Sequence, residues 1–199
     1  MLSDPATCQA PSGPFSHAYV TITDVQVNVS STASATDGSW VDLTPSLSKS
    51  PKQVDLLGLA NSNCFLASLG DSLQVQAGTY QQLRLILAPN TTTFTGNACS
   101  TASAANCVVL TSDSSVHALN LSSEAQTGIK IPSGQIASGA FTISAGQTKD
   151  LDIDFNSASQ LSRKAMGNTV SSRSFMLVRS ARLQLQLTAK FWTRQPEIL

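Results

Sequence analysis

Alternation of apolar and polar residues is clearest in residues 73–87. Leu83, Leu85 and Leu87 recur with a period of two, which predicts a strand with one apolar face. Gly78 lies where a tight turn would join this strand to residues 73–76, so the segment predicts a β-hairpin. Tyr80, just after the turn, can bury its ring and direct its hydroxyl back to a main-chain group. We expect the other strands to pack around this hairpin.

Similar patterns recur along the chain. Val20 and Ile22 fall on one face of the first strand but Val25 and Val27 on the other, which predicts a β-bulge near Thr23 and Asp24. Further strands are expected at 40–43, 64–69, 108–110, 116–121, 129–131, 139–143, 151–155, 175–178 and 182–191. Residues 54–59 suit either a helical turn or a short strand, and the polar segment 157–172 has room for one short helix around 158–166. About ten short strands with polar turns predict an all-β, antiparallel Greek-key sandwich.

Length and composition favour one domain with a real core. The chain has 199 residues, of which 41% are hydrophobic and only 12% charged, and its formal net charge is zero. A nucleic-acid-binding protein would be expected to be basic, so that class is set aside. We expect an extended arm at 1–16, a single sandwich at 17–192 and a tail at 193–199.

The four cysteines predict disulfides. None lies in a Cys-x-x-Cys pair, and two histidines do not complete a zinc site, so disulfides are favoured over metal ligation. Four cysteines allow three pairings; Cys99 with Cys107 would staple one polar loop, and Cys8 with Cys64 would tie the arm to the body. Disulfides predict an oxidising compartment, and therefore an extracellular or cell-surface location. No segment is long and apolar enough to span a membrane, and residues 1–4 are not the start of a signal peptide, so we expect an export signal to have been removed.

Several motifs occur in an order that resembles a known family. They are ITDVQV (22–27), GSW (38–40), VDLLGL (54–59), AGTYQQLRL (77–85), IPSG (131–134) and LDIDF (151–155), the last leading to Ser159. Over residues 18–190 this order is similar to a bacterial family of exported, often lipid-anchored surface domains of unknown function. The resemblance implies an immunoglobulin- or transthyretin-like sandwich at the cell surface and supplies no catalytic residues. Asn156 departs from it, because an acidic residue is expected there.

One metal site is a candidate. Asp150, Asp152 and Asp154 alternate with apolar residues, so they project from one face of a strand about 6.6 Å apart. Calcium binds several oxygen ligands, and surface modules often use weak calcium sites. The alternative is a solvated outer face whose carboxylates are far enough apart to tolerate one another. Calcium is therefore the one cofactor to consider.

Enzymatic motifs are weak. Residues 70–73 spell Gly-Asp-Ser-Leu, the signature of a serine-esterase family, which also needs an Asp-x-x-His motif near the C-terminus. His17 and His117 are the two histidines, and neither lies in such a motif, so we read the match as chance and predict no enzyme.

The C-terminal part of the chain is the candidate partner surface. From residue 161 onward seven basic residues accompany one glutamate, which could support head-to-tail self-association. Trp192 follows Phe191 on the opposite face of the last strand, beside Arg182 and Lys190. We therefore expect a non-enzymatic surface protein for adhesion or structure, able to form filaments through β-strand contacts with copies of itself or other surface proteins. The alternative is a calcium- or carbohydrate-binding module, with Trp40, Phe94 and Trp192 as the sugar platform.

Overall fold

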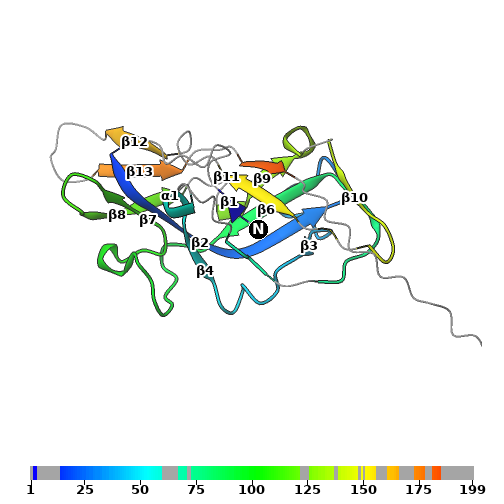
Figure 1. Ribbon diagram of the computed structural model, residues 1–199, viewed down its shortest axis with the longest axis horizontal. Coiled ribbons are helices and arrows are strands. Elements are labelled where there is room, and N and C mark those ends of the chain that lie inside the picture. The colour runs from blue at the N-terminus through cyan, green and yellow to red at the C-terminus, as the bar shows by residue number, and fades with distance from the viewer. Residues whose placement is uncertain are drawn as a thin grey trace, which may run out of the picture.

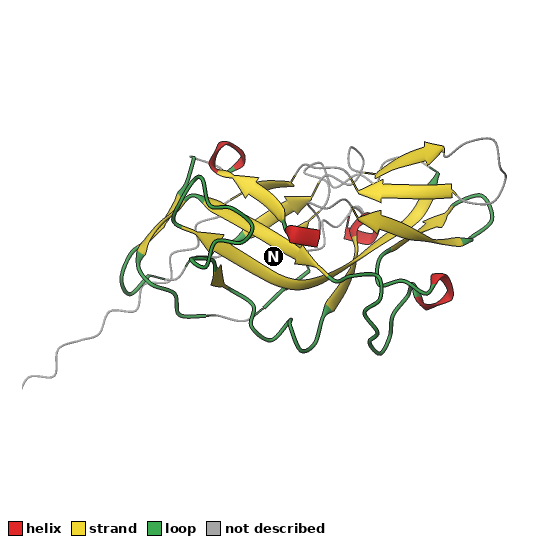
Figure 2. Cartoon of the chain, turned by 180° about the vertical axis from the view of Figure 1, so that it is seen from behind, coloured by secondary structure: helices red, strands yellow, loops and turns green. Residues whose placement is uncertain are grey.

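The protein is a mostly antiparallel all-β sandwich, as the sequence predicts (Figures 1 and 2). The computed structural model describes residues 2–3, 14–59, 67–70, 73–121, 126–136, 139–147, 149, 151–155, 161–165, 173–177 and 181–184. In the strands formed by residues 2–3, 161–165, 173–177 and 181–184, and for several side chains of 151–155, only the backbone is described.

Strand β2 (Phe15–Asn28) organises the largest sheet. One edge of β2 pairs with β7 (Cys107–Leu110) and then with β6 (Gln82–Leu87), and the opposite edge pairs with β4 (Lys52–Asp55) and β3 (Val41–Asp42). Beyond β6 lies β9 (Ile129–Pro132), and beyond β7 lie β8 (Val116–Leu121), β13 (Arg173–Leu177) and β12 (Leu161–Ala165). The long curved ribbon of β2 in Figure 1 therefore carries two groups of strands.

The predicted bulge in β2 is confirmed. The register with β6 shifts between Ile22 and Asp24, and this shift brings Val25 and Val27 into the same core as Val20. Asn106, which is fully buried, lies where β2 changes its partner from β7 to β6. Its side chain accepts from Thr21 N at 2.8 Å and donates to Ala88 O at 2.8 Å, so it fills the gap where β2 leaves β7 and meets β6.

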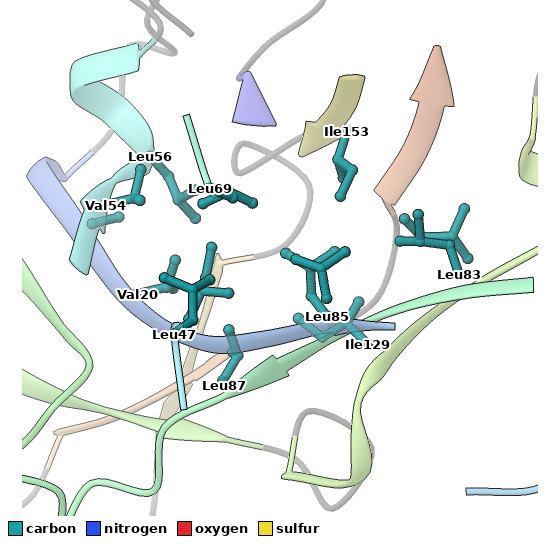
Figure 3. Packing of buried hydrophobic residues seen from close by; sticks show 14 of the residues in the cluster. Val20, Leu47, Val54, Leu56, Leu69, Leu83, Leu85, Leu87, Ile129 and Ile153 are labelled. Atoms are coloured by element: carbon teal, nitrogen blue, oxygen red, sulfur yellow. The ribbon is translucent and has the colours of Figure 1, made fainter. Parts of the chain in front are cut away.

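A three-stranded sheet forms the opposite layer. It consists of β1 (Leu2–Ser3), β11 (Asp152–Phe155) and β14 (Ala181–Gln184), with β1 parallel and β14 antiparallel to the central β11. Ile153 of β11 is buried, and Figure 3 shows it pointing toward Leu85 and Ile129 of the large sheet. The core between the layers also contains residues of β2, β4, β6 and the segments after β3 and β4, among them Val20, Leu47, Val54, Leu56, Leu69, Leu83 and Leu87.

The predicted hairpin at residues 73–87 is wrong, although its second strand is correct. Residues 73–76 form no strand, and β5 (Gly78–Tyr80) pairs instead with β10 (Phe141–Ile143). Tyr80 is 2% exposed, stacks on Phe141 at a centroid distance of 5.3 Å and donates its hydroxyl to Gln76 O at 2.8 Å. The role expected for Tyr80 is thus confirmed, but burial of its ring against Phe141 decides the strand pairing. Gly78 does not have the positive φ that a tight hairpin turn would have required.

Two further segments differ from or refine the expectations. Residues 54–59 contain both of the predicted alternatives, a strand and a helical turn. Strand β4 ends at Asp55, and the one-turn helix α1 (Leu56–Leu59) follows directly. The helix expected around 158–166 is wrong, because residues 161–165 form β12 and pair antiparallel with β13. That pairing is long-range, and the local polarity of the segment gives no sign of it. Two short 3-10 turns, η1 (Ser100–Ala102) and η2 (Ser133–Gln135), complete the described elements.

The disulfide expected between Cys99 and Cys107 is present, with both residues fully buried. Cys8 and Cys64 lie outside the described residues. Gln53 of β4 holds the loop between Cys99 and Cys107 and the residues before it, because its amide donates to Ala105 O at 3.0 Å and to Asn97 Oδ1 at 2.9 Å.

We expect a Cys99→Ser/Cys107→Ser variant to lose about 2.5 kcal/mol of unfolding free energy, the loop-closure entropy of a short disulfide loop. Urea denaturation of the parent and variant proteins, each without reductant, measures the difference. Equal midpoints would show that the contacts of Gln53 hold the loop without the disulfide.

Among the described residues no helix is long and apolar enough to cross a membrane.

Candidate functional site

A layer of polar side chains covers the outer face of the large sheet after the bulge. Gln26 of β2, Arg84 of β6 and Lys130 of β9 stand in one cross-strand row, because Gln26 pairs with Arg84 and Arg84 with Lys130. The loop of residues 29–40 lies over this row. Alternation alone would leave such positions exposed, yet Arg84 is only 8% exposed.

Arg84 is the centre of this layer. Its Nε donates to Gln26 Oε1 at 2.7 Å, and its Nη1 donates to Ala35 O at 2.8 Å and to Thr127 O at 3.3 Å. The guanidinium carbon lies 4.1 Å from the centre of the Trp40 ring, a cation–π geometry. Burial lowers the pKa of Arg84, and the charge of Asp24 opposes this effect. The residue remains a cation, because an arginine pKa starts far above neutral pH.

Trp40 and Lys130 complete the closure of the loop. Lys130 Nζ lies 5.9 Å from the centre of the Trp40 ring and donates to Ala33 O at 2.9 Å. The indole nitrogen of Trp40 donates to Ser34 O at 2.8 Å. Two cations thus bind the main-chain carbonyls of one loop and share one aromatic ring. This explains Trp40, which the sequence offered as part of a sugar platform: it pins the loop to the sheet.

A pair of carboxyl groups lies at the edge of the same layer. Asp24, at the bulge of β2, lies diagonally across from Asp42 of the edge strand β3, which pairs with Gln26, and Thr44 contacts both carboxyl groups. Burial, a hydrogen bond to Asp42 and the charge of Asp42 together raise the pKa of Asp24 to about 6, against the hydrogen bonds from Gln26 and the Val25 main chain, which lower it. The Gln26 amide donates to Asp24 Oδ2, and Thr44 N donates to Asp42 Oδ1 at 2.6 Å. Two carboxyl groups in contact share a proton more readily than they ionise together.

A second cluster lies at the start of β2. His17 Nδ1 and Asp55 Oδ2 are 2.7 Å apart, with side-chain exposures of 47% and 19%, and the His17 ring stacks on Tyr19. Burial, followed by the charge of Asp55, raises the pKa of Tyr19. Asp55 Oδ1 accepts from the main-chain nitrogens of Ala18 and Leu57 at 3.1 and 3.2 Å, so this residue caps α1.

Asp55 also explains the glycine of the VDLLGL segment. A Cβ at Gly58 would lie 2.8 Å from Asp55 Oδ2. The capping carboxylate and the small residue therefore form one unit, which indicates a structural role for this segment.

The other histidine lies in a different arrangement from a catalytic triad. Ser115 Oγ donates to Asp113 Oδ1 at 2.6 Å and lies 2.8 Å from His117 Nε2. The serine lies between the acid and the imidazole, and its hydroxyl donates a hydrogen bond to the acid. In a triad the histidine stands in the middle and takes the proton of the serine. Likewise Ser16, next to His17, directs its hydroxyl to Val109 O at 3.4 Å.

Most of the sequence-predicted site residues lie where the structure describes little. Asp150 and the side chains of Asp152 and Asp154 are outside the described part, as are Trp192 and Lys190. The β11–β14 register places Arg182 opposite Asp154, two opposite charges at facing positions. Within the described residues no group of three or more acidic, histidine or cysteine side chains is arranged to hold a metal ion. The calcium site at 150–154 stays a prediction.

The polar layer itself was not predicted from the sequence. The signals that could have found it are Trp40 directly after a polar segment, Arg84 among the leucines of the AGTYQQLRL segment, and Gly128 before β9. Gly128 has a φ of +110°, and a Cβ there would lie 2.8 Å from Arg84 Cδ. No local pattern links these three positions.

Comparison with protein families agrees with the resemblance seen in the sequence. A family described as a domain of unknown function, DUF4382, matches residues 2–170. The chain belongs to this family. The DUF4382 match spans β1 to β12, while β13 and β14 lie beyond its end. No curated protein and no solved structure matches the chain.

Proposed function

We propose that the protein is a non-enzymatic, exported surface protein that serves as an adhesive or structural subunit and assembles through β-strand contacts. The observation that carries this proposal is β1: Leu2 and Ser3 add as a parallel strand beside Ile153 and Asp154 of β11. A segment near the N-terminus thus acts as an added strand, the means by which many proteins join neighbouring copies. The same slot can take the corresponding segment of another copy, with the same pairing.

Other features support export and a role in binding rather than catalysis. The buried Cys99–Cys107 disulfide suits an oxidising compartment. Among the described residues, Ser115 and His17 come closest to a catalytic arrangement, and both are engaged in structural hydrogen bonds. A sugar platform at Trp40 has less support, because that ring packs against Arg84 and Lys130.

The test is electron microscopy and size-exclusion chromatography of the non-reduced protein over a concentration series. We expect oligomers or filaments that grow with concentration and that a Leu2→Pro/Ser3→Pro variant no longer forms, because proline removes the main-chain donors of β1. Ser12→Pro, placed between Pro11 and Gly13, is the matched control and should assemble like the parent. Monomers of the parent at every concentration would refute the proposal.

A further inference from the structure

The edge strand β3 is held to β2 by few groups. It consists of two residues, and after it Leu43 N donates to Val25 O at 2.8 Å. Val25 N in turn donates to Thr44 Oγ1 at 2.9 Å. So short an edge strand is easily displaced. Side-chain contacts between β3 and β2 therefore determine how stably β3 stays paired.

The carboxyl pair lies across this junction. Asp24 is on β2 and Asp42 is on β3, and Thr44 Oγ1 reaches Asp24 Oδ1 at 3.4 Å. With one proton on the pair, one carboxyl donates to the other and draws the strands together. With no proton, two carboxylates face each other across the same gap and repel.

Other charges near the pair come from two elements. Arg84 on β6 acts on Asp24 through Gln26, which accepts from Arg84 Nε and donates to Asp24. Lys130 on β9 is the next residue in the cross-strand row after Arg84, and its Nζ lies 5.9 Å from the centre of the Trp40 ring. The charges of Arg84 and Asp24 act on each other, but neither Arg84 nor Lys130 contacts Asp42 in a described hydrogen bond, so no described cation bridges the two carboxylates.

We propose that Asp24 and Asp42 form a proton-operated latch, which holds β3 and Thr44 on β2 when the pair carries one proton and loosens them when it carries none. The loop of residues 29–40 stays attached through Arg84 and Lys130, so the release is confined to residues 41–44, and Trp40, next to Val41, reports it. The edge of β2 at Val25 and Val27 then becomes available for pairing with another strand.

The direction of the pH effect follows from the pKa of Asp24, which is about 6 in the folded protein and lower in the unfolded chain. Between about pH 4 and about pH 6 the folded protein keeps a proton that the unfolded chain has released. The stabilisation by the latch is therefore complete at low pH, declines as the pH rises through this window and is absent above it.

The test uses the full chain in a Trp192→Phe background, which leaves Trp40 as its one tryptophan, in buffers containing a chelator. We expect Trp40 emission to change with a midpoint near pH 6, and exchange of the Leu43 amide at about pH 8 to be at least several-fold faster in this protein than in its Asp24→Asn variant at the same pH. Asparagine donates an amide hydrogen to Asp42 at every pH, so that variant stays closed. Asp42→Asn should likewise abolish the pH response.

The control is Asp113→Asn, which removes a carboxylate in the turn before β8 and should leave the response unchanged. Identical Trp40 profiles and Leu43 exchange in the parent background and in Asp24→Asn would overturn the latch. So would a response that survives in Asp24→Asn, because the titrating group would then lie elsewhere.

Discussion

Replacing Arg84 by alanine is expected to lower the free energy of unfolding by about 3–4 kcal/mol, more than a typical substitution. The side chain is nearly buried and satisfies three acceptors: Gln26 Oε1, Ala35 O and Thr127 O. Its removal leaves these acceptors without their donor and takes the cation from the Trp40 ring. Water that enters the space recovers only part of the loss.

Urea denaturation followed by circular dichroism measures this change, and two variants identify its source. Arg84→Lys keeps a positive charge but lacks the planar group of donors. It should therefore lower the free energy of unfolding by about half as much as Arg84→Ala. Lys130→Ala removes a more exposed cation with one described hydrogen bond, and should cost about 1 kcal/mol or less. If Arg84→Ala and Lys130→Ala were equally mild, the loop would be held by contacts other than Arg84.

The sequence predicts those parts of the fold that depend on local alternation. The bulge in β2 follows from the change of phase between Ile22 and Val25, and the burial of Tyr80 follows from its amphipathic ring. Strand partners cannot be predicted from local alternation, because pairing depends on residues far apart in the sequence. Tyr80, for example, pairs with Phe141 and not with residues 73–76. The strand at 161–165 was missed for the same reason, because its partner β13 is not adjacent in the local pattern.

The candidate site was harder to predict for a related reason. A polar residue at an outward position is normally exposed, so Arg84 and Gln26 read as surface residues. Only the loop that carries Trp40 turns their row into a buried layer, and its course is set by contacts with Ala33 and Ala35 carbonyls. Main-chain acceptors leave no signature in the sequence. The raised pKa of Asp24 likewise depends on burial in the folded protein and on Asp42, which comes from another strand.

The latch and the proposed strand-mediated assembly concern different edges. The β1 slot lies on the small sheet beside β11, whereas the latch controls the β3 edge of the large sheet. An assembly that depends on β1 should be insensitive to Asp24→Asn. Loss of pH response and loss of assembly are therefore separate results, and each proposal stands or fails alone.

Gly128→Ala is the second change with a large expected effect, about 3–4 kcal/mol of lost unfolding free energy. Gly128 has a φ of +110°, which a residue with a side chain rarely adopts. In addition, a Cβ would lie 2.8 Å from Arg84 Cδ and 2.9 Å from Ile86 Cδ1. The added methyl group therefore strains the backbone and displaces the stem of the central arginine at the same time.

Gly139→Ala separates the two causes. Gly139 also has a positive φ, +79°, but a Cβ there meets nothing within 4 Å. The Gly139→Ala substitution should therefore lower the free energy of unfolding only through backbone strain, by about 1 kcal/mol. Urea denaturation of both variants gives the comparison, and Trp40 emission in the Trp192→Phe background reports the position of the arginine. We expect Gly128→Ala to shift that emission and Gly139→Ala to leave it unchanged. Equal stability losses in the two variants would mean that backbone strain alone acts at Gly128 and that the polar layer tolerates movement of Arg84.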